Sequence, residues 1–220
     1  MTTPTLELEY SLIERGFDCV IGVDEVGRGA LAGPVWVSAA LWSPACSAIP
    51  EGLRDSKAIS EKKRPEMASR AQAWLHLVTS GTRQAEHIDA EGIVASLGLA
   101  GVAAIKQLAD ALSDFSRPVI VLDGNSDWLS TRLGRSIPVM TQTKADATAA
   151  SVSGASVVAK VGRDTLMVDA EQNYPGYGFA GHKGYGSAAH RDAIERLGVC
   201  DLHRKTWIHP RDDQRLPGLD

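Results

Sequence analysis

Cysteine is scarce in this sequence, and its spacing excludes two kinds of site. Three cysteines occur in 220 residues, and they lie far apart, at Cys19, Cys46 and Cys200. An odd number of isolated cysteines is not a disulfide framework, and without a C-x-x-C pair it does not indicate a zinc site. We therefore expect reduced thiols in a reducing compartment, and a cytoplasmic protein.

Long apolar segments and a targeting leader are also missing. The longest apolar stretch, residues 93–105, contains two glycines and is too short to cross a bilayer. Residues 1–10 carry acidic side chains and no lysine or arginine, unlike the basic start of a secretory signal. We expect no membrane partner.

An excess of positive charge is missing as well. The formal net charge is −4, which disfavours a protein that binds nucleic acid through general charge attraction alone. The charge is uneven, because residues 1–60 carry eight acidic and four basic side chains whereas residues 132–164 carry two acidic and five basic ones. An acidic total is compatible with local clusters of either sign, so the net charge does not decide the partner.

The composition is that of one folded domain. Hydrophobic residues make up 44% and charged residues 23% of the chain, which excludes a disordered, fibrous or coiled-coil protein. A chain of this length buries roughly 70% of the surface that its unfolded form exposes. We expect residues 1–220 to form a single domain with a loose tail over 210–220, where proline, glycine and charged residues mix.

The order of predicted strands and helices indicates an α/β fold. Short β-branched runs bounded by glycine or proline predict strands, and longer runs with helical spacing predict helices. Ser187 is placed to cap the last helix and Gly198 to end it. The result is a sandwich in which helices flank a mixed sheet, with a hairpin formed by the first two strands. The expected strands are 19–23, 35–42, 74–79, 118–122 and 137–140, and the expected helices are 60–72, 91–112, 147–168 and 188–197.

Acidic residues follow three of the apolar segments. Asp24 and Glu25 end the first predicted strand, Asp123 ends the fourth, and Asp146 follows the fifth. Ligands gather at strand ends in such sheets, and carboxylates brought together there repel one another unless cations bridge them. Oxygen ligands favour Mg²⁺ or Mn²⁺, and two such ions stabilise both oxygens of an in-line phosphoryl displacement. Taken singly, each acid is more often a solvated turn residue or a helix cap, so the repetition after apolar strands is what favours a metal site.

A glycine-rich segment, Gly27, Arg28 and Gly29, directly follows the first acidic pair. Glycines allow a backbone to approach a ligand closely, and arginine binds phosphate. For an isolated pair of glycines, a plain hairpin turn is the better explanation. The dinucleotide-binding fingerprint is disfavoured, because Pro34 stands where that motif needs a helix.

Two further segments offer groups for a nucleic-acid ligand. Residues 174–186 interleave aromatic side chains with glycine, His182 and Lys183, which suits stacking on a sugar or base beside a phosphate. Ser56 and Lys57 add a hydroxyl and an ammonium group. Each segment also has an ordinary interpretation, the first as a loop that covers the core and the second as a turn with a helix cap.

Taken together, these segments resemble the signature of ribonuclease HII. The matches occur in the family's order from about residue 20 to residue 207, which is nearly the whole chain. The segments that carry the resemblance are Val23-Asp24-Glu25-Val26-Gly27-Arg28-Gly29, Leu31-Ala32-Gly33-Pro34-Val35, Asp55-Ser56-Lys57, Leu122-Asp123-Gly124-Asn125, Lys144-Ala145-Asp146, Arg163-Asp164, His182-Lys183-Gly184-Tyr185-Gly186 and His203-Arg204.

The resemblance implies a ribonuclease H-like fold with a helical C-terminal portion over about 165–209. It implies hydrolysis of the RNA strand of RNA–DNA hybrids, and incision 5′ to a single ribonucleotide embedded in duplex DNA, leaving 5′-phosphate and 3′-hydroxyl ends. It also implies two Mg²⁺ or Mn²⁺ ions when substrate is bound, and a tyrosine that stacks on a sugar. The catalytic, metal-binding acids would be Asp24, Glu25, Asp123 and Asp146. The expected substrate-binding residues are Gly27, Arg28, Gly29, Ser56, Lys57, Lys183 and Tyr185.

Departures from the family pattern are mild. Residues 149–154 lack the aromatic or proline that often follows the fourth acid, and Ser187 stands where threonine is common. The tail over 210–220 lacks the paired aromatics of a sliding-clamp peptide. The sequence therefore gives no support for binding to a sliding clamp. We expect a monomer.

Three alternatives differ in what they require of the sequence. Ribonuclease HIII would be expected to have a Gly-Lys-Gly loop and an extra N-terminal domain, whereas Arg28 occupies the loop here. Another nuclease of the same fold would share the acids without the glycine-rich segment and Tyr185. A non-catalytic protein that binds hybrids would be expected to lack at least one of the four acids.

Overall fold

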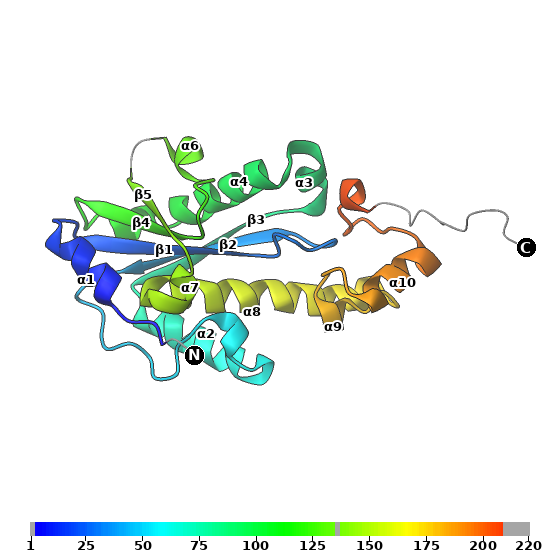
Figure 1. Ribbon diagram of the computed structural model, residues 1–220, viewed down its shortest axis with the longest axis horizontal. Helices are drawn as coiled ribbons and strands as arrows, with labels where there is room; N and C mark the ends of the chain where they lie inside the picture. Colours follow the sequence, from blue (N-terminus) through cyan, green and yellow to red (C-terminus); the bar gives the residue numbers. More distant parts are fainter. Residues whose placement is uncertain (1–2, 135–136, 209–220) are drawn as a thin grey trace, which may run out of the picture.

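A five-stranded mixed sheet forms the centre of the structure and separates two layers of helices (Figure 1). The computed structural model describes residues 3–134 and 137–208. The strand order across the sheet is β3-β2-β1-β4-β5, which confirms the predicted α/β sandwich. The strands are β1 (Cys19–Val26), β2 (Val35–Trp42), β3 (Leu77–Arg83), β4 (Pro118–Asp123) and β5 (Val139–Gln142).

Helices cover both faces of the sheet, with α4 on one face and α8 on the other (Figure 1). The α-helices are α1 (Glu7–Glu14), α2 (Arg64–Trp74), α3 (Ala85–Glu91), α4 (Ile93–Lys106), α5 (Ala109–Leu112), α6 (Ser130–Leu133), α7 (Ala145–Thr148), α8 (Ala150–Asn173), α9 (Phe179–His182) and α10 (Ala188–Leu197). Three 3₁₀ turns are η1 (Ser56–Ala58), η2 (Glu61–Lys63) and η3 (Lys205–Trp207).

The central strand β1 is buried on both faces, and its side chains alternate between two cores. Val20 packs in the core on the α8 side, whereas Ile21 and Val23 pack in the core on the α4 side. A strand covered on both faces needs apolar residues in succession, which explains the unbroken apolar run in the sequence. β1 pairs antiparallel with β2, as the predicted hairpin requires, and parallel with β4.

Small residues allow α8 to lie close against β1. A Cβ atom at Gly22 would lie 2.4 Å from the carbonyl carbon of Ser151. Residues 150–157 of α8 are all buried and consist of alanine, serine, valine and glycine. Because no large side chain separates the two backbones, the first turns of α8 lie directly beside the end of β1 that carries the acidic pair.

Two predicted helices differ in extent from the observed ones. The predicted helix 91–112 is broken at Gly92, whose φ of +80° is accessible to glycine but does not occur inside a helix. The predicted helix 147–168 is observed as α8 over 150–173, and the extended residue Ala149 separates it from α7. Ala149 forms a bridge with Thr5, which explains the interruption.

The third strand starts later than predicted, at Leu77 instead of Trp74. Trp74 is the last residue of α2, and its indole N–H donates to the Ser47 carbonyl at 2.8 Å. Pairing with β2, from Leu41 opposite Leu77 onward, then fixes the register of the strand. β5 and α2 are likewise displaced by a few residues from the predicted 137–140 and 60–72.

The C-terminal part of the described chain is helical and has a small core of its own. The hydroxyl of Ser187 accepts from the His190 N–H at 3.2 Å, and Gly198, with a φ of +77°, ends α10, as predicted. The predicted tail over 210–220 lies outside the described residues. The buried residues of this third core are Ala32, Met167, Tyr177, Phe179 and Ala193.

All three cysteines are free thiols. Burial, together with the nearby Asp18 carboxylate, raises the pKa of the Cys19 thiol to about 12. No helix over residues 3–134 and 137–208 is long and apolar enough to span a membrane.

We predict that Gly22→Ala lowers the free energy of unfolding by about 1–3 kcal/mol, because the added Cβ forces α8 away from β1. Urea denaturation measures the change. Gly181→Ala is the matched control, since a Cβ there meets nothing within 4 Å. Equal losses in the two variants would contradict the close contact.

Candidate acidic site at the carboxyl ends of β1 and β4

Three acidic residues lie near one another where the parallel strands β1 and β4 end. The register pairs Val23 with Leu122, so Asp24 and Asp123 are the next residues along the two strands. Asp146 arrives from the following segment, in α7, and its N–H donates to the Asp123 Oδ1 at 3.3 Å. The acids predicted from strand ends therefore lie at one edge of the sheet.

Burial and mutual repulsion raise the pKa of three of the four carboxyl groups. For Asp24, which is 7% exposed, burial is the main cause and Glu25 the next, followed by Asp123 and Asp146. Burial also raises the pKa of Glu25, against the effect of the Arg28 guanidinium, with a further rise from Asp123. For Asp146, burial and then Asp123 raise the pKa. These groups disfavour full ionisation unless positive charge is supplied.

Two side chains supply part of that charge. Arg28 Nη1 lies 3.6 Å from Glu25 Oε1, and Lys57 Nζ lies 3.5 Å from Asp146 Oδ2. Burial opposes the charge on Lys57, but Asp55, Asp146 and Asp24 outweigh it and raise the pKa of the ammonium group. Lys57 is thus placed at the acids, whereas sequence reasoning had only assigned it to phosphate binding.

Hydrogen bonds from the backbone and from α8 hold the acids in place. Asp24 Oδ1 accepts from the Glu25 N–H at 2.8 Å, and a hydrogen bond with Ser156 of α8 favours the charged form of Asp24. Ser153, one turn earlier, donates its hydroxyl to the Asp146 carbonyl at 2.6 Å. The closeness of α8 to β1 therefore places these serines where the acids need partners.

The donor set suits a hard divalent cation. All four side chains offer carboxylate oxygens, the ligands that Mg²⁺ and Mn²⁺ prefer, and their crowding calls for compensating positive charge. The side chains therefore fit divalent cations in chemical type. Within the described part of the chain, however, no three acidic, histidine or cysteine side chains are arranged so that they could hold a metal ion.

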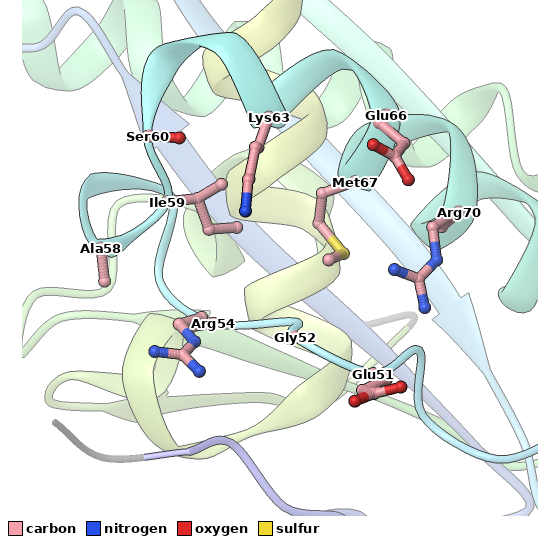
Figure 2. A pocket seen from close by; sticks show the side chains of 10 residues that line it. All are labelled: Glu51, Gly52, Arg54, Ala58, Ile59, Ser60, Lys63, Glu66, Met67 and Arg70. Carbon is pink, nitrogen blue, oxygen red and sulfur yellow. The ribbon is translucent and has the colours of Figure 1, made fainter.

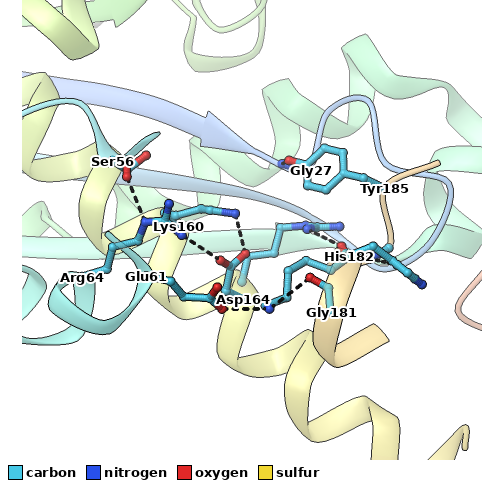
Figure 3. A network of polar contacts seen from close by, with 12 residues as sticks. Gly27, Ser56, Glu61, Arg64, Lys160, Asp164, Gly181, His182 and Tyr185 are labelled. Carbon is cyan, nitrogen blue, oxygen red and sulfur yellow. Dashed lines mark hydrogen bonds and ion pairs between the residues drawn. The ribbon is translucent and has the colours of Figure 1, made fainter. Parts of the chain in front are cut away.

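The glycine-rich segment, residues 27–29, lies against Tyr185. The Gly27 N–H donates to the Tyr185 hydroxyl at 3.2 Å, and Figure 3 shows the two residues side by side. Gly27 has a φ of +84°, and a Cβ there would lie 2.0 Å from the Nε of Arg163. A Cβ at Gly29 would meet nothing within 4 Å, and Arg28 is exposed. The loop therefore has one buried and one open glycine.

Arg163 is a buried support that sequence reasoning did not assign to the site. Its side chain is fully buried in α8 and donates to the carbonyls of Pro34, Ala32 and Lys183 at 2.9–3.0 Å. The guanidinium carbon lies 5.3 Å from the centre of the Tyr185 ring. A charged residue within a helix of small apolar residues was the available signal, because buried charges need partners.

A network of charged side chains joins η1 to α8 (Figure 3). Arg64 Nε donates to the Ser56 carbonyl at 2.9 Å, and Arg64 Nη1 lies 3.7 Å from Asp164 Oδ2. Lys160 Nζ lies 2.8 Å from Asp164 Oδ1 and 5.9 Å from the centre of the Tyr185 ring. The network thus connects η1, which carries Lys57, with the ring of Tyr185.

Two predicted substrate-binding residues are occupied elsewhere in this arrangement. The Ser56 side chain is buried, and its hydroxyl oxygen lies 3.1 Å from that of Ser156. Lys183 is 6% exposed, and its ammonium group lies 3.0 Å from Glu61 Oε1 and also contacts the Ala180 carbonyl. The structure therefore does not bring Lys183 to the four acids, and contact of Ser56 or Lys183 with substrate stays a prediction.

A pocket of about 450 Å³ flanks η1 but contains none of the four acids (Figure 2). Its charged lining is mixed, with Arg54, Lys63 and Arg70 among the basic residues and Glu51 and Glu66 among the acidic ones. The chemistry described above therefore belongs to the open edge of the sheet and not to this pocket.

Comparison with known proteins identifies a matching family and similar sequences. A family model described as Ribonuclease HII matches residues 21–209. Ribonuclease HII from Geotalea uraniireducens (strain Rf4) is 42% identical to this chain over 202 residues, which cover 92% of this chain and 88% of that protein.

Two solved structures share the fold. Ribonuclease H2 from Pyrococcus horikoshii OT3 superposes with a TM-score of 0.62 at 25% identity, covering 86% of this chain and 93% of that one. A chain in the PCNA:RNase HII complex from Archaeoglobus fulgidus gives a TM-score of 0.68 at 21% identity, with coverages of 89% and 98%. At 21% identity the second likeness concerns the fold alone.

We predict that Asp24→Asn stabilises the metal-free protein at neutral pH. The pKa of Asp24 is raised in the folded state, so its ionisation destabilises the fold as the pH rises above the unfolded value of about 3.9. In EDTA at pH 7 the free energy of unfolding should increase by about 1 kcal/mol or more, and the gain should shrink as the pH falls toward 4. Urea denaturation at both pH values measures this.

The control for this variant is Asp114→Asn, which removes an exposed carboxylate before β4. It should change stability little at either pH. A gain in Asp24→Asn that is independent of pH would contradict the charge explanation. Adding Mg²⁺ should stabilise the wild type more than Asp24→Asn, because the ion binds only the folded state.

Proposed function

This chain belongs to the ribonuclease HII family of metal-dependent endonucleases, and from that membership we propose that it incises duplex DNA on the 5′ side of a single embedded ribonucleotide, besides cleaving the RNA strand of hybrids. The observation that carries the proposal is the hydrogen bond from the Gly27 N–H to the Tyr185 hydroxyl, beside the acidic site. It unites a backbone that can read a 2′-hydroxyl with a ring that can stack on the next sugar.

The acidic site is assigned the chemistry. Two divalent ions, Mg²⁺ or Mn²⁺, are proposed to be held there with substrate bound, and they supply stabilisation of the attacking and leaving oxygens in a displacement that leaves 5′-phosphate and 3′-hydroxyl ends. The raised pKa values of three of the acids reflect a site that favours added positive charge. The ligands in this assignment are Asp24, Glu25, Asp123 and Asp146.

Lys57 and Arg28 are assigned to the substrate phosphates. Both are exposed, and both lie beside acids. With divalent cations bound at the acids, the ammonium and guanidinium groups would lose their carboxylate partners. They are then available to bind the backbone of the nucleic acid, where charge-assisted hydrogen bonds are strong.

Gly27–Gly29 and Tyr185 are assigned to recognition of the step from RNA to DNA. The open space at Gly29 leaves its backbone accessible, and Tyr185 is 36% exposed. A 2′-hydroxyl both donates and accepts hydrogen bonds, so backbone groups distinguish it from a deoxyribose. The tyrosine ring then meets the sugar that follows.

One protomer carries all of these groups, so we propose a monomer in which residues 1–220 form a single catalytic domain. The helical portion over about 165–209 contributes Tyr185 to the site. The relative from Archaeoglobus fulgidus is bound to PCNA, but its likeness concerns the fold, and we propose no clamp partner for this chain.

The test of the proposed function is incision of a DNA duplex that holds one ribonucleotide, in Mg²⁺ and in Mn²⁺. We expect a single cut at the 5′ side of the ribonucleotide and none in the all-DNA duplex. Cleavage of long RNA–DNA hybrids without incision at the single ribonucleotide would overturn the finer assignment and leave the family's hybrid cleavage intact.

We predict that Asp123→Asn lowers kcat by orders of magnitude while substrate binding largely survives. The variant removes one charge from the metal site, whereas the groups assigned to the phosphates are untouched. Cleavage in Mg²⁺ and binding by fluorescence anisotropy in Ca²⁺ measure the two effects. Asp114→Asn is the control and should match the wild type, and a near-normal rate in Asp123→Asn would refute the metal assignment.

We predict that Tyr185→Ala reduces kcat/KM at a single ribonucleotide more than on a long hybrid, where several registers are available. Loss of a stacked ring costs about 1–3 kcal/mol, or roughly 5- to 150-fold. Gly29→Ala should weaken both reactions without changing the unfolding free energy, since its Cβ is unopposed in the free protein. If the ratio of the two kcat/KM values does not change in Tyr185→Ala, the ring has no part in reading the junction.

A further inference from the structure

Arg204 connects the C-terminal segment to the glycine-rich loop near the start of the chain. Its side chain is fully buried, and it lies just before η3, 177 residues from Gly27 in sequence. The His203-Arg204 pair belongs to the family signature in the sequence, but the functions assigned above give it no role.

The guanidinium of Arg204 holds the loop by its carbonyl oxygens. Nη2 donates to the Gly27 carbonyl at 2.6 Å, and Nη1 donates to the Arg28 carbonyl at 2.8 Å. Nε and Nη2 also reach the Gly33 carbonyl, at 3.3 and 3.2 Å. The backbone N–H of Arg204 donates to the Leu31 carbonyl at 2.8 Å. One residue therefore fixes both ends of the segment 27–33.

Two peptide planes of the loop are oriented by these contacts. In a trans peptide the C=O and the following N–H point in opposite directions, and no cis peptide occurs in the described chain. Since the carbonyls of Gly27 and Arg28 point inward to Arg204, the N–H groups of Arg28 and Gly29 point away from it. Both residues are exposed, so the loop presents two adjacent backbone donors on its outer side. Successive N–H groups of this kind form a concavity for an oxygen or an anion.

The arginine and the loop depend on each other energetically. The hydrogen bonds of the Arg204 side chain within the described chain all go to backbone carbonyls. Burial, and then the positive charge of Arg163, lower the pKa of Arg204 to about 10. The ring of Trp207 covers the guanidinium of Arg204, whose Cζ lies 4.8 Å from the ring centre. If the loop carbonyls turned away, a buried charge would lose its partners, so the loop is held in one conformation.

The neighbouring residue His203 supports the segment that carries Tyr185. His203 Nε2 lies 3.2 Å from His190 Nε2, and His190 Nδ1 lies 3.0 Å from the Tyr185 carbonyl. His203 and His190 are both buried. Two consecutive residues of the C-terminal segment thus set the loop and the segment of Tyr185 relative to each other.

We propose that Arg204 is a positioning residue that turns the N–H groups of Arg28 and Gly29 toward the substrate and thereby sets the preference for the RNA-to-DNA junction. The proposal rests on the function proposed above. It goes further by assigning the control of substrate choice to a buried residue that does not touch the substrate.

The test is Arg204→Lys in the full chain. Lysine keeps the charge but cannot donate to three carbonyls in one plane. We expect kcat/KM at a single embedded ribonucleotide to fall roughly tenfold more than kcat/KM on a long hybrid, because misplacement of the loop affects the more demanding substrate. In the double variant with Tyr185→Ala, the ratio of kcat/KM at a single ribonucleotide to kcat/KM on a long hybrid should be no lower than in either single variant. The reason is that both residues act on recognition of the same junction.

Arg196→Lys is the matched control. Arg196 also lies in the C-terminal segment and donates to a glycine carbonyl, that of Gly176, at 3.1 Å, but it does not contact the loop. It should leave the ratio unchanged. Equal losses on both substrates in Arg204→Lys, or multiplicative effects with Tyr185→Ala, would show a merely structural role and overturn the proposal. Failure of the wild type itself to incise at a single ribonucleotide would instead overturn the proposed function, and the inference with it.

A second variant covers the case in which Arg204→Lys does not fold. Trp207→Leu keeps the arginine but removes the ring that covers its guanidinium, which loosens the hold of Arg204 on the loop carbonyls. We expect the same direction of change in the ratio, by about two- to threefold, with circular dichroism confirming the fold. An unchanged ratio in folded Trp207→Leu would overturn the proposal.

Discussion

Repulsion between carboxylates at one edge of the sheet is the constraint on which the rest of the structure depends. Parallel pairing of β1 and β4 forces Asp24 and Asp123 to neighbouring positions, and α7 adds Asp146. Such an arrangement opposes folding, since burial first, and then repulsion from the neighbouring acids, raise the pKa of Asp24. It persists because the apolar strands behind it, packed between α4 and α8, contribute far more than the acids cost. The charge of these acids and the stability of the fold are therefore in conflict at this edge.

A second group of buried charges has the opposite sign and lies under the glycine-rich segment, residues 27–29. Arg163 and Arg204 are both fully buried, and backbone carbonyls receive their hydrogen bonds. The site therefore has two parts, the acids at the carboxyl ends of β1 and β4 and the arginines buried behind the loop. The acidic part suits cations, while the positive charge beneath the loop suits the phosphate backbone of a nucleic acid.

The positions of the acids could be predicted from the sequence, but the contacts of Arg204 and Lys183 could not, for a physical reason. The acids could be predicted because each follows an apolar strand, and because parallel strands end at the same edge of the sheet. Arg204 gives no such local signal, because its partners lie up to 177 residues away. Lys183 is similar: its sequence context suggests a phosphate, but a left-handed backbone with a φ of +53° accompanies a side chain turned toward Glu61. The ligand and substrate roles of the site residues stay predictions.

The long separation between Arg204 and the loop also orders events during synthesis of the chain. The loop emerges from the ribosome early, whereas the arginine that orients it is made 177 residues later. At about 5–20 residues per second, that delay is roughly 9–35 s. During this interval β1 and β2 are available to pair, but residues 27–29 have no guanidinium beneath them. The strand that carries Asp24 and Glu25 is therefore synthesised well before Arg204, the residue whose guanidinium holds the carbonyls of Gly27 and Arg28.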